Sequence, residues 1–180
     1  MQRTSGLKEL AYGYRDEAEK AFKAEHIEDA IILHKKAIQV LEQLDEPEEL
    51  LEALVKLGVY HAVSGEDDLA IDGYMSALDL AMKCGDTYSQ ARILNNVANR
   101  LLEIRDFRGA RDIFLKALSL AMDERSKKHP NYERLKIVLY LNIVNALVEL
   151  EQITEAEKYS KPFSRACNCR RNFGCWYCRY

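Results

Sequence analysis

Three pairs of alanines recur along the chain at intervals of 40 residues, and this repeat restricts the fold more than any other feature. The pairs are Ala30 with Ala37, Ala70 with Ala77, and Ala110 with Ala117. Seven residues span about two turns of an α-helix, so both alanines of a pair face the same side. A bulkier side chain lies between them: His34, Tyr74 and Phe114 in turn. Small and large side chains in alternation let two helices pack closely, which predicts a chain of repeated helical units.

A second amphipathic segment precedes each alanine pair, which predicts one helical hairpin for each repeat. Turn and helix-start residues separate the segments at Gly65, Gly85–Asp86 and Arg105–Asp106. Gly85 is expected to end one helix and Asp86 to cap the next. The expected helix pairs are 5–24 with 28–44, 47–64 with 67–84, and 86–104 with 107–125.

The fourth unit departs from the 40-residue spacing. Ala156 follows Ala110 by 46 residues, and we assign the six extra residues to a polar loop at 126–131. A helix is expected over 132–151. A second helix should follow this one and end at Pro162, because proline disrupts a helix interior. The predicted helical domain spans 5–161, with units at 11–44, 51–84, 91–125 and 137–161, and a poorly ordered tail occupies 162–180.

The second unit resembles the tetratricopeptide repeat family. The residues that match its pattern are Leu54, Leu57, Gly58, Ala70, Tyr74 and Ala77. The 40-residue period is similar to a longer-period subgroup, found in light-chain cargo adaptors and in bacterial regulatory proteins. The resemblance implies an all-α, right-handed superhelix of antiparallel helix pairs with three to four repeats. It also implies a concave groove, lined by the first helix of each pair, that binds peptides or partner segments without catalysis or a cofactor.

Asparagines recur on the helices expected to line this groove. Asn96 and Asn99 are repeated 46 residues later as Asn142 and Asn145, so they occupy matching places in neighbouring units. A carboxamide both donates and accepts hydrogen bonds, so a row of them could hold the main chain of an extended peptide. In a second interpretation they bond to the backbones of adjacent helices or to water. If the first holds, replacing Asn96 and Asn142 together by alanine weakens partner binding and leaves the melting temperature unchanged.

Charged residues occupy the matching places in the earlier units. Glu19 and Lys56 stand where a carboxylate clamp of the chaperone-adaptor type would need asparagine, which argues against that clamp. Cations near the groove still offer capacity to bind anions. The predicted partner-binding residues are Arg15, Lys56, Arg92, Asn95, Asn96, Asn99, Asn142 and Asn145.

The tail concentrates cysteine, arginine and aromatic residues. Four cysteines, Cys167, Cys169, Cys175 and Cys178, could in principle hold zinc. Only five residues separate the two cysteine pairs, which is much closer than in zinc ribbons and fingers. Charge and aromatic stacking could instead bring the segment to nucleic acid or to an anionic membrane. The plainest interpretation is an adventitious or truncated end with no metal.

Charge and motif content narrow the function. The net charge is −3, and all 29 acidic residues lie in 1–160, so this part is acidic and a poor match for nonspecific nucleic-acid binding. Met1–Leu10 lacks the apolar core of a secretory signal, and the longest apolar stretch, at 137–148, is too short to span a bilayer. We therefore expect a cytoplasmic protein. Phosphate-binding loops, nucleophile elbows and zinc-protease signatures are absent from the sequence.

Three functions remain open at this stage. The first is a non-catalytic scaffold that binds a protein or peptide segment and no small-molecule substrate. The second is the regulatory portion of a bacterial signalling enzyme or transcription regulator that lacks its output domain. The third is a metal- or nucleic-acid-binding protein that acts through the cysteine-rich tail. Incomplete cover over Ile137, Tyr140 and Val144 would also allow self-association through the carboxyl-terminal repeat.

Overall fold

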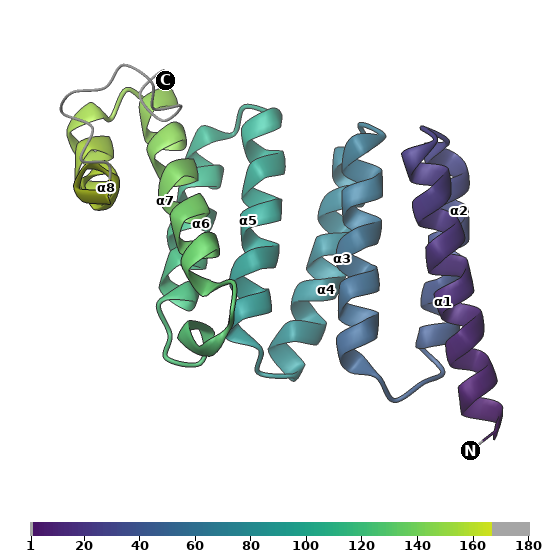
Figure 1. The fold of residues 1–180 in the computed structure, drawn as a ribbon. Coiled ribbons are helices and arrows are strands. Elements are labelled where there is room, and N and C mark those ends of the chain that lie inside the picture. Colours follow the sequence, from purple (N-terminus) through teal and green to yellow (C-terminus); the bar gives the residue numbers. More distant parts are fainter. Residues whose placement is uncertain (1, 167–180) are drawn as a thin grey trace.

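The computed structural model describes the backbone of residues 2–166 and is helical throughout (Figure 1). The cysteines of the tail, which were considered as zinc ligands, lie outside these residues. In the described part, a 3-10 helix η1 (Ser126–Lys128) accompanies the α-helices, which are α1 (Gln2–Lys23), α2 (Ile27–Leu41), α3 (Pro47–Val63), α4 (Asp67–Lys83), α5 (Thr87–Glu103), α6 (Phe107–Ala121), α7 (Tyr132–Glu149) and α8 (Ile153–Ala166). The predicted all-α class is confirmed.

The helices form a solenoid in which each one packs against the next in sequence. Antiparallel pairs follow one another from α1 and α2 at one end to α7 and α8 at the other (Figure 1). The first helices of the pairs, α1, α3, α5 and α7, are called the inner helices below. Among them, α5 and α7 approach each other more closely than α1 and α3 or α3 and α5 do.

The alanine pairs lie at the centre of the packing, as predicted. All of them are fully buried, and so is Phe114. In the second unit the ring of Tyr74 takes up the space that Gly58 leaves open. A Cβ added at Gly58 would lie 2.5 Å from Tyr74 Cε1 and 3.1 Å from the carbonyl oxygen of Ala70. Glycine at this position therefore allows α3 and α4 to pack closely against each other.

The turn inside each helix pair contains a residue with positive φ. These residues are Glu25 (63°), Gly65 (78°), Arg105 (65°) and Glu151 (59°). Glycine adopts this conformation without steric cost, whereas other residues are strained in it. The sequence signals predicted turns at Gly65 and at Arg105–Asp106, but a long charged residue gives no local sign of positive φ, so this conformation was not predicted at Glu25, Arg105 or Glu151.

Two of the predicted helix caps are formed by aspartates. The backbone N–H of Ser89 donates to the carboxylate of Asp86 at 3.0 Å, and the N–H of Gly109 donates to Asp106 at 2.9 Å. Each bond satisfies an N–H group that has no partner within the first turn of its helix. Gly85 has a φ of 66°, so Gly85–Asp86 ends one helix and begins the next as expected.

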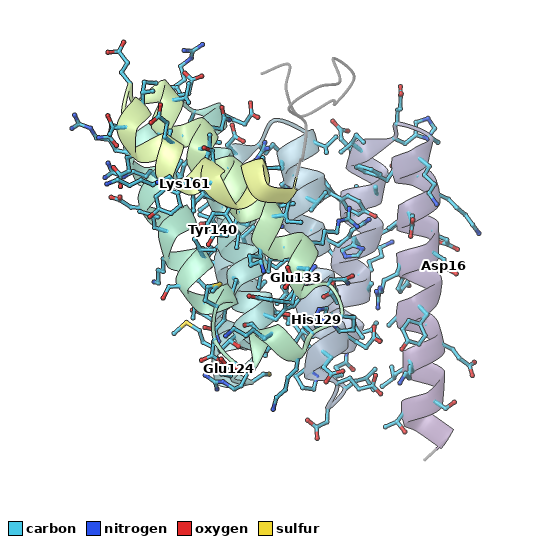
Figure 2. All side chains as sticks on the ribbon, turned by 60° about the vertical axis from the view of Figure 1, so that its left-hand side comes forward. Asp16, Glu124, His129, Glu133, Tyr140 and Lys161 are labelled. Carbon is cyan, nitrogen blue, oxygen red and sulfur yellow. The ribbon has the colours of Figure 1, made fainter. Side chains whose placement is uncertain are left out.

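The insertion before α7 is folded onto α5. Its 3-10 helix η1 begins at Ser126, which is fully buried and whose Oγ lies 2.8 Å from both Thr87 Oγ1 and the carbonyl oxygen of Leu120. The ring of His129 stacks on Tyr88 with a centroid distance of 3.5 Å. Figure 2 shows His129 close to the start of α7. The segment predicted as a polar loop therefore carries specific packing contacts.

The helix α8 corrects one expectation. It continues through Pro162 to Ala166, so the prediction that Pro162 ends this helix is wrong. Proline cannot donate to the carbonyl four residues earlier, but the loss of one bond does not prevent the next residues from remaining helical. The inner helix α7 is partly covered by α8, because Tyr140 packs near Tyr159 while Ile137 stays 40% exposed. Self-association through this surface stays a prediction.

Within residues 2–166, the structure contains no helix that combines the length and the apolar character required to cross a membrane.

Candidate functional site

A groove of about 950 Å³ lies on the inner helices in the amino-terminal half of the solenoid. Residues of α1, α3 and α5 line it, and His34 reaches it from α2. The aliphatic part of the lining includes Val55 and Val59. Charged residues dominate the rest, and they are Arg15, Asp16, Glu19, Glu49, Glu52, Lys56 and Arg92.

Two ion pairs connect the inner helices across this groove. Arg15 on α1 pairs with Glu49 on α3, and Arg92 on α5 pairs with Glu52 on α3. The side chains in both pairs remain partly exposed, so solvent and salt screen the attraction. Such pairs can exchange partners with a charged ligand at little cost.

Lys56 is the groove cation that is not held by a carboxylate among the residues described. Its Nζ lies 5.6 Å from the centroid of the Tyr60 ring and 5.9 Å from that of Phe22. The two rings stack on each other at 4.7 Å and form a platform for the ammonium group. Lys56 is therefore positioned but remains available to a ligand.

The floor of the groove contains two buried polar side chains, His34 (2% exposed) and Tyr60 (0% exposed). Nε2 of His34 lies 2.9 Å from the carbonyl oxygen of Ala53, so Nε2 carries the proton and donates. Burial lowers the pKa of His34, which keeps the ring neutral and leaves Nδ1 as an acceptor. Neither Nδ1 of His34 nor the Tyr60 hydroxyl has a hydrogen-bond partner within the described part of the chain.

Nε of Arg92 is a third buried polar atom for which residues 2–166 provide no hydrogen-bond partner. A second, smaller hollow of about 240 Å³ lies between α5 and α7 and shares Arg92 with the groove. Arg134 and Asn131 line that hollow together with Tyr88. Of these two hollows, the larger lies in the amino-terminal half of the inner surface.

The predicted asparagines divide into separate environments. Nδ2 of Asn142 on α7 donates to Oδ1 of Asn95 at 2.8 Å and of Asn99 at 3.2 Å, both on α5. Asn95 is buried at 7% exposure, whereas Asn145 is exposed. Asn96 lines the groove. Three of these amides thus join two helices, an arrangement that neither of the two earlier interpretations described.

The structure brings four of the predicted partner-binding residues together in the groove: Arg15, Lys56, Arg92 and Asn96. Sequence reasoning missed Tyr60, whose matching places in the next two units hold Arg100 and Ala146. It treated His34 only as a substitute for an aromatic ring. The available signal was the departure of these two residues from the repeat. His34 stands where later units hold Tyr74 and Phe114, and Tyr60 differs from the residues at its own matching places.

Metal-binding groups are not clustered in the described residues, where no three histidine, cysteine, aspartate or glutamate side chains could hold an ion together. Cys84 is an exposed free thiol. The four cysteines considered as zinc ligands, Cys167, Cys169, Cys175 and Cys178, lie outside the described residues.

Comparison with solved structures defines the fold. Aspartyl phosphate phosphatase F from Bacillus subtilis is 16% identical, with a TM-score of 0.75, over 87% of this chain and 40% of its own. The kinesin-light-chain-like tetratricopeptide repeats from Podosopora anserina are 11% identical, with a TM-score of 0.69, over 93% of this chain and 79% of theirs. The fold is that of tetratricopeptide repeats. The resemblance found in the sequence is thereby confirmed at the level of the fold.

A third similar structure contains a ligand. It is the Rap conjugation gene regulator of a plasmid in complex with the Phr peptide, 19% identical with a TM-score of 0.70 over 90% of this chain and 44% of its own. The chain spans less than half of the length of aspartyl phosphate phosphatase F and of the Rap conjugation gene regulator. No protein-family model and no curated protein matches the sequence.

Proposed function

We propose that the protein is a non-catalytic scaffold that binds a peptide, or an extended segment of a partner protein, in the groove between α1, α3 and α5. The observation that carries the proposal is a groove of about 950 Å³ whose lining residues combine charged side chains with buried polar atoms that have no partner in the described part of the chain. Buried polar groups without partners are costly, so a ligand that satisfies them gains affinity.

A polypeptide suits this groove better than a small ion that carries charge of one sign only. The lining carries three cationic and four anionic side chains, so charges of both signs can find complements along an extended chain. Asn96 and Nε of Arg92 offer hydrogen bonds to main-chain groups. The peptide complex of the Rap conjugation gene regulator, which has a similar fold, gives independent support.

The test is a selection of random heptapeptides displayed on phage against the full chain. An enriched peptide is then synthesised with a fluorophore, and its affinity is measured by anisotropy. Val59→Arg places a long charged side chain in the groove and should weaken binding by about tenfold or more, which corresponds to at least ~1.4 kcal/mol. Ile32→Arg is the matched control, because Ile32 on α2 is 54% exposed and does not line the groove.

Circular dichroism melting of both variants verifies that each one folds. Equal affinity of the wild type and Val59→Arg would refute binding in this groove, as would a failure of the selection to enrich any peptide whose affinity depends on Val59.

A further inference from the structure

We infer that His34 and Tyr60 form a subsite in the groove that selects an uncharged carboxamide side chain, asparagine or glutamine, of the bound peptide. The inference rests on the proposed function, because it specifies one residue of the same ligand. It follows from three features of the groove floor: the acceptor on His34, the donor on Tyr60, and the charges around them.

The acceptor is Nδ1 of His34. Because Nε2 donates to the carbonyl oxygen of Ala53 at 2.9 Å, the neutral ring presents a lone pair at Nδ1. His34 is one of the residues that line the groove, and its Nδ1 is buried without a hydrogen-bond partner among the described residues. A ligand group must therefore bring an N–H or O–H donor, which an ionised carboxylate cannot do.

The donor is the hydroxyl of Tyr60. It is buried without a hydrogen-bond partner among the described residues, and the Tyr60 ring packs edge-on against His34 with a centroid distance of 5.2 Å. Burial raises the pKa of Tyr60, so the hydroxyl keeps its proton at neutral pH. A ligand group must offer an acceptor here, and ammonium and guanidinium groups have none.

The neighbouring charges favour a neutral ligand group. Nζ of Lys56 lies 5.6 Å from the centroid of the Tyr60 ring and repels a second cation. Glu19 lines the same groove near Tyr60 and repels an anion. A carboxamide carries one donor group and one acceptor, bears no charge, and so matches His34 and Tyr60 together.

The experiment uses peptides selected as above whose binding is weakened by Val59→Arg. Their aligned sequences should share one position enriched in asparagine or glutamine. One such peptide is then synthesised with glutamine, glutamate or methionine at that position, three side chains of similar length. The glutamine peptide should bind about tenfold more tightly than the other two, because each analogue leaves a buried polar group unpaired.

Two conservative variants connect the preference to the proposed atoms. Tyr60→Phe removes only the hydroxyl, and His34→Gln can keep the bond to Ala53 while moving the acceptor from Nδ1 to a side-chain amide oxygen in a different position. Each should weaken binding of the glutamine peptide about tenfold and leave the methionine peptide within twofold. In the wild type, the ¹⁵N chemical shift of His34 Nδ1 should move on addition of the glutamine peptide but not of the glutamate peptide, which tests the inference without any variant.

The outcomes separate the two proposals. Peptides that depend on Val59 but show no position enriched in asparagine or glutamine would overturn this inference and leave the proposed function in place. Enrichment of serine, aspartate or arginine at the position near His34 would overturn it as well. If no selected peptide depends on Val59, both proposals fail.

Discussion

The two halves of the inner surface use the same repeat in opposite ways. In the amino-terminal half, ion pairs between partly exposed side chains bridge α1, α3 and α5 around an open groove. In the carboxyl-terminal half, α5 and α7 pack directly, and the amide of Asn142 bonds to two asparagines of α5. Exposed ion pairs contribute little to stability and exchange readily, whereas hydrogen bonds between partly buried side-chain amides are costly to break. The first half is thus suited to binding and the second to holding its shape.

The hydrophobic core is also larger in the carboxyl-terminal half than in the amino-terminal half. The second, third and fourth units share one continuous buried cluster that includes Tyr74, Phe114 and Leu139. The first unit contributes to two small clusters, one around Leu41 and one around Tyr60. In a solenoid, each unit is stabilised by its neighbours only, so the smaller clusters make the amino-terminal unit the weaker end.

The largest effect is expected from removing a ring of the continuous core. Phe114→Ala should lower the free energy of unfolding by about 3–5 kcal/mol, because Phe114 is fully buried and the cavity cannot collapse completely. Phe22→Ala in the first unit should cost less, since Phe22 is only partly buried and stacks on one ring. Urea denaturation measures both, and equal losses would contradict the difference in core packing.

The amide cluster supplies the next test. Asn142→Ala should cost about 1–3 kcal/mol, because it leaves the buried side chain of Asn95 without its donor. Asn145→Ala is the matched control one turn away; Asn145 is exposed, and its loss should stay within about 0.5 kcal/mol. Thermal melting distinguishes them. This result also bears on the double replacement of Asn96 and Asn142, which should now lower the melting temperature instead of leaving it unchanged. Similar melting of the two single variants would show that the cluster does not hold α7 to α5.

The turns should respond alike in both halves, which makes them an internal control for the comparison. Glu25→Gly and Arg105→Gly each replace a strained residue of positive φ by the residue type that adopts it freely. Each should stabilise the chain by about 1 kcal/mol or less, and Gly65→Ala should destabilise it by a similar amount. Chemical denaturation with an unchanged m-value is the measurement. A gain at Arg105 with a loss at Glu25 would indicate that the two halves differ in their turns as well.

Much of the fold could be predicted from the sequence because its signals are local. The alanine pairs recur at a fixed interval, and Asp86 and Asp106 carry their capping function in their own side chains. The positive φ of Glu25 could not be predicted in this way, because a long charged residue gives no local sign that the packed helices force it into that conformation.

The candidate site could be predicted only in part, and for a physical reason. Register placed Lys56 and Asn96 on the inner helices, and both line the groove. The bond from Asn142 to Asn95 depends on how closely and at what rotation α7 meets α5, which no single-helix pattern contains. Tyr60 was missed because its role depends on its burial beside His34 and not on its own position in the repeat.

The smallest effect is expected from acidification, and it should be confined to the amino-terminal half. Burial lowers the pKa of His34 below the value near 6.5 that histidine has in an unfolded chain. The folded state therefore prefers the neutral ring, so the stability that His34 contributes is present above pH 6.5 and is lost as the pH falls through the folded pKa. Tyr74 and Phe114, at the matching places of the next units, do not titrate in this range.

Hydrogen exchange followed by mass spectrometry can resolve the two halves. Between pH 7.5 and pH 5, after correction for the intrinsic exchange rate, protection of α1 and α2 should decrease relative to α5 and α6. His34→Phe, which introduces the ring found in the third unit, should reduce this difference, while the exposed His26 serves as a control whose replacement by glutamine leaves it unchanged. If protection falls equally along the solenoid, or if His34→Phe retains the full pH response, the acid sensitivity of the binding half does not arise from the histidine in the floor of its groove.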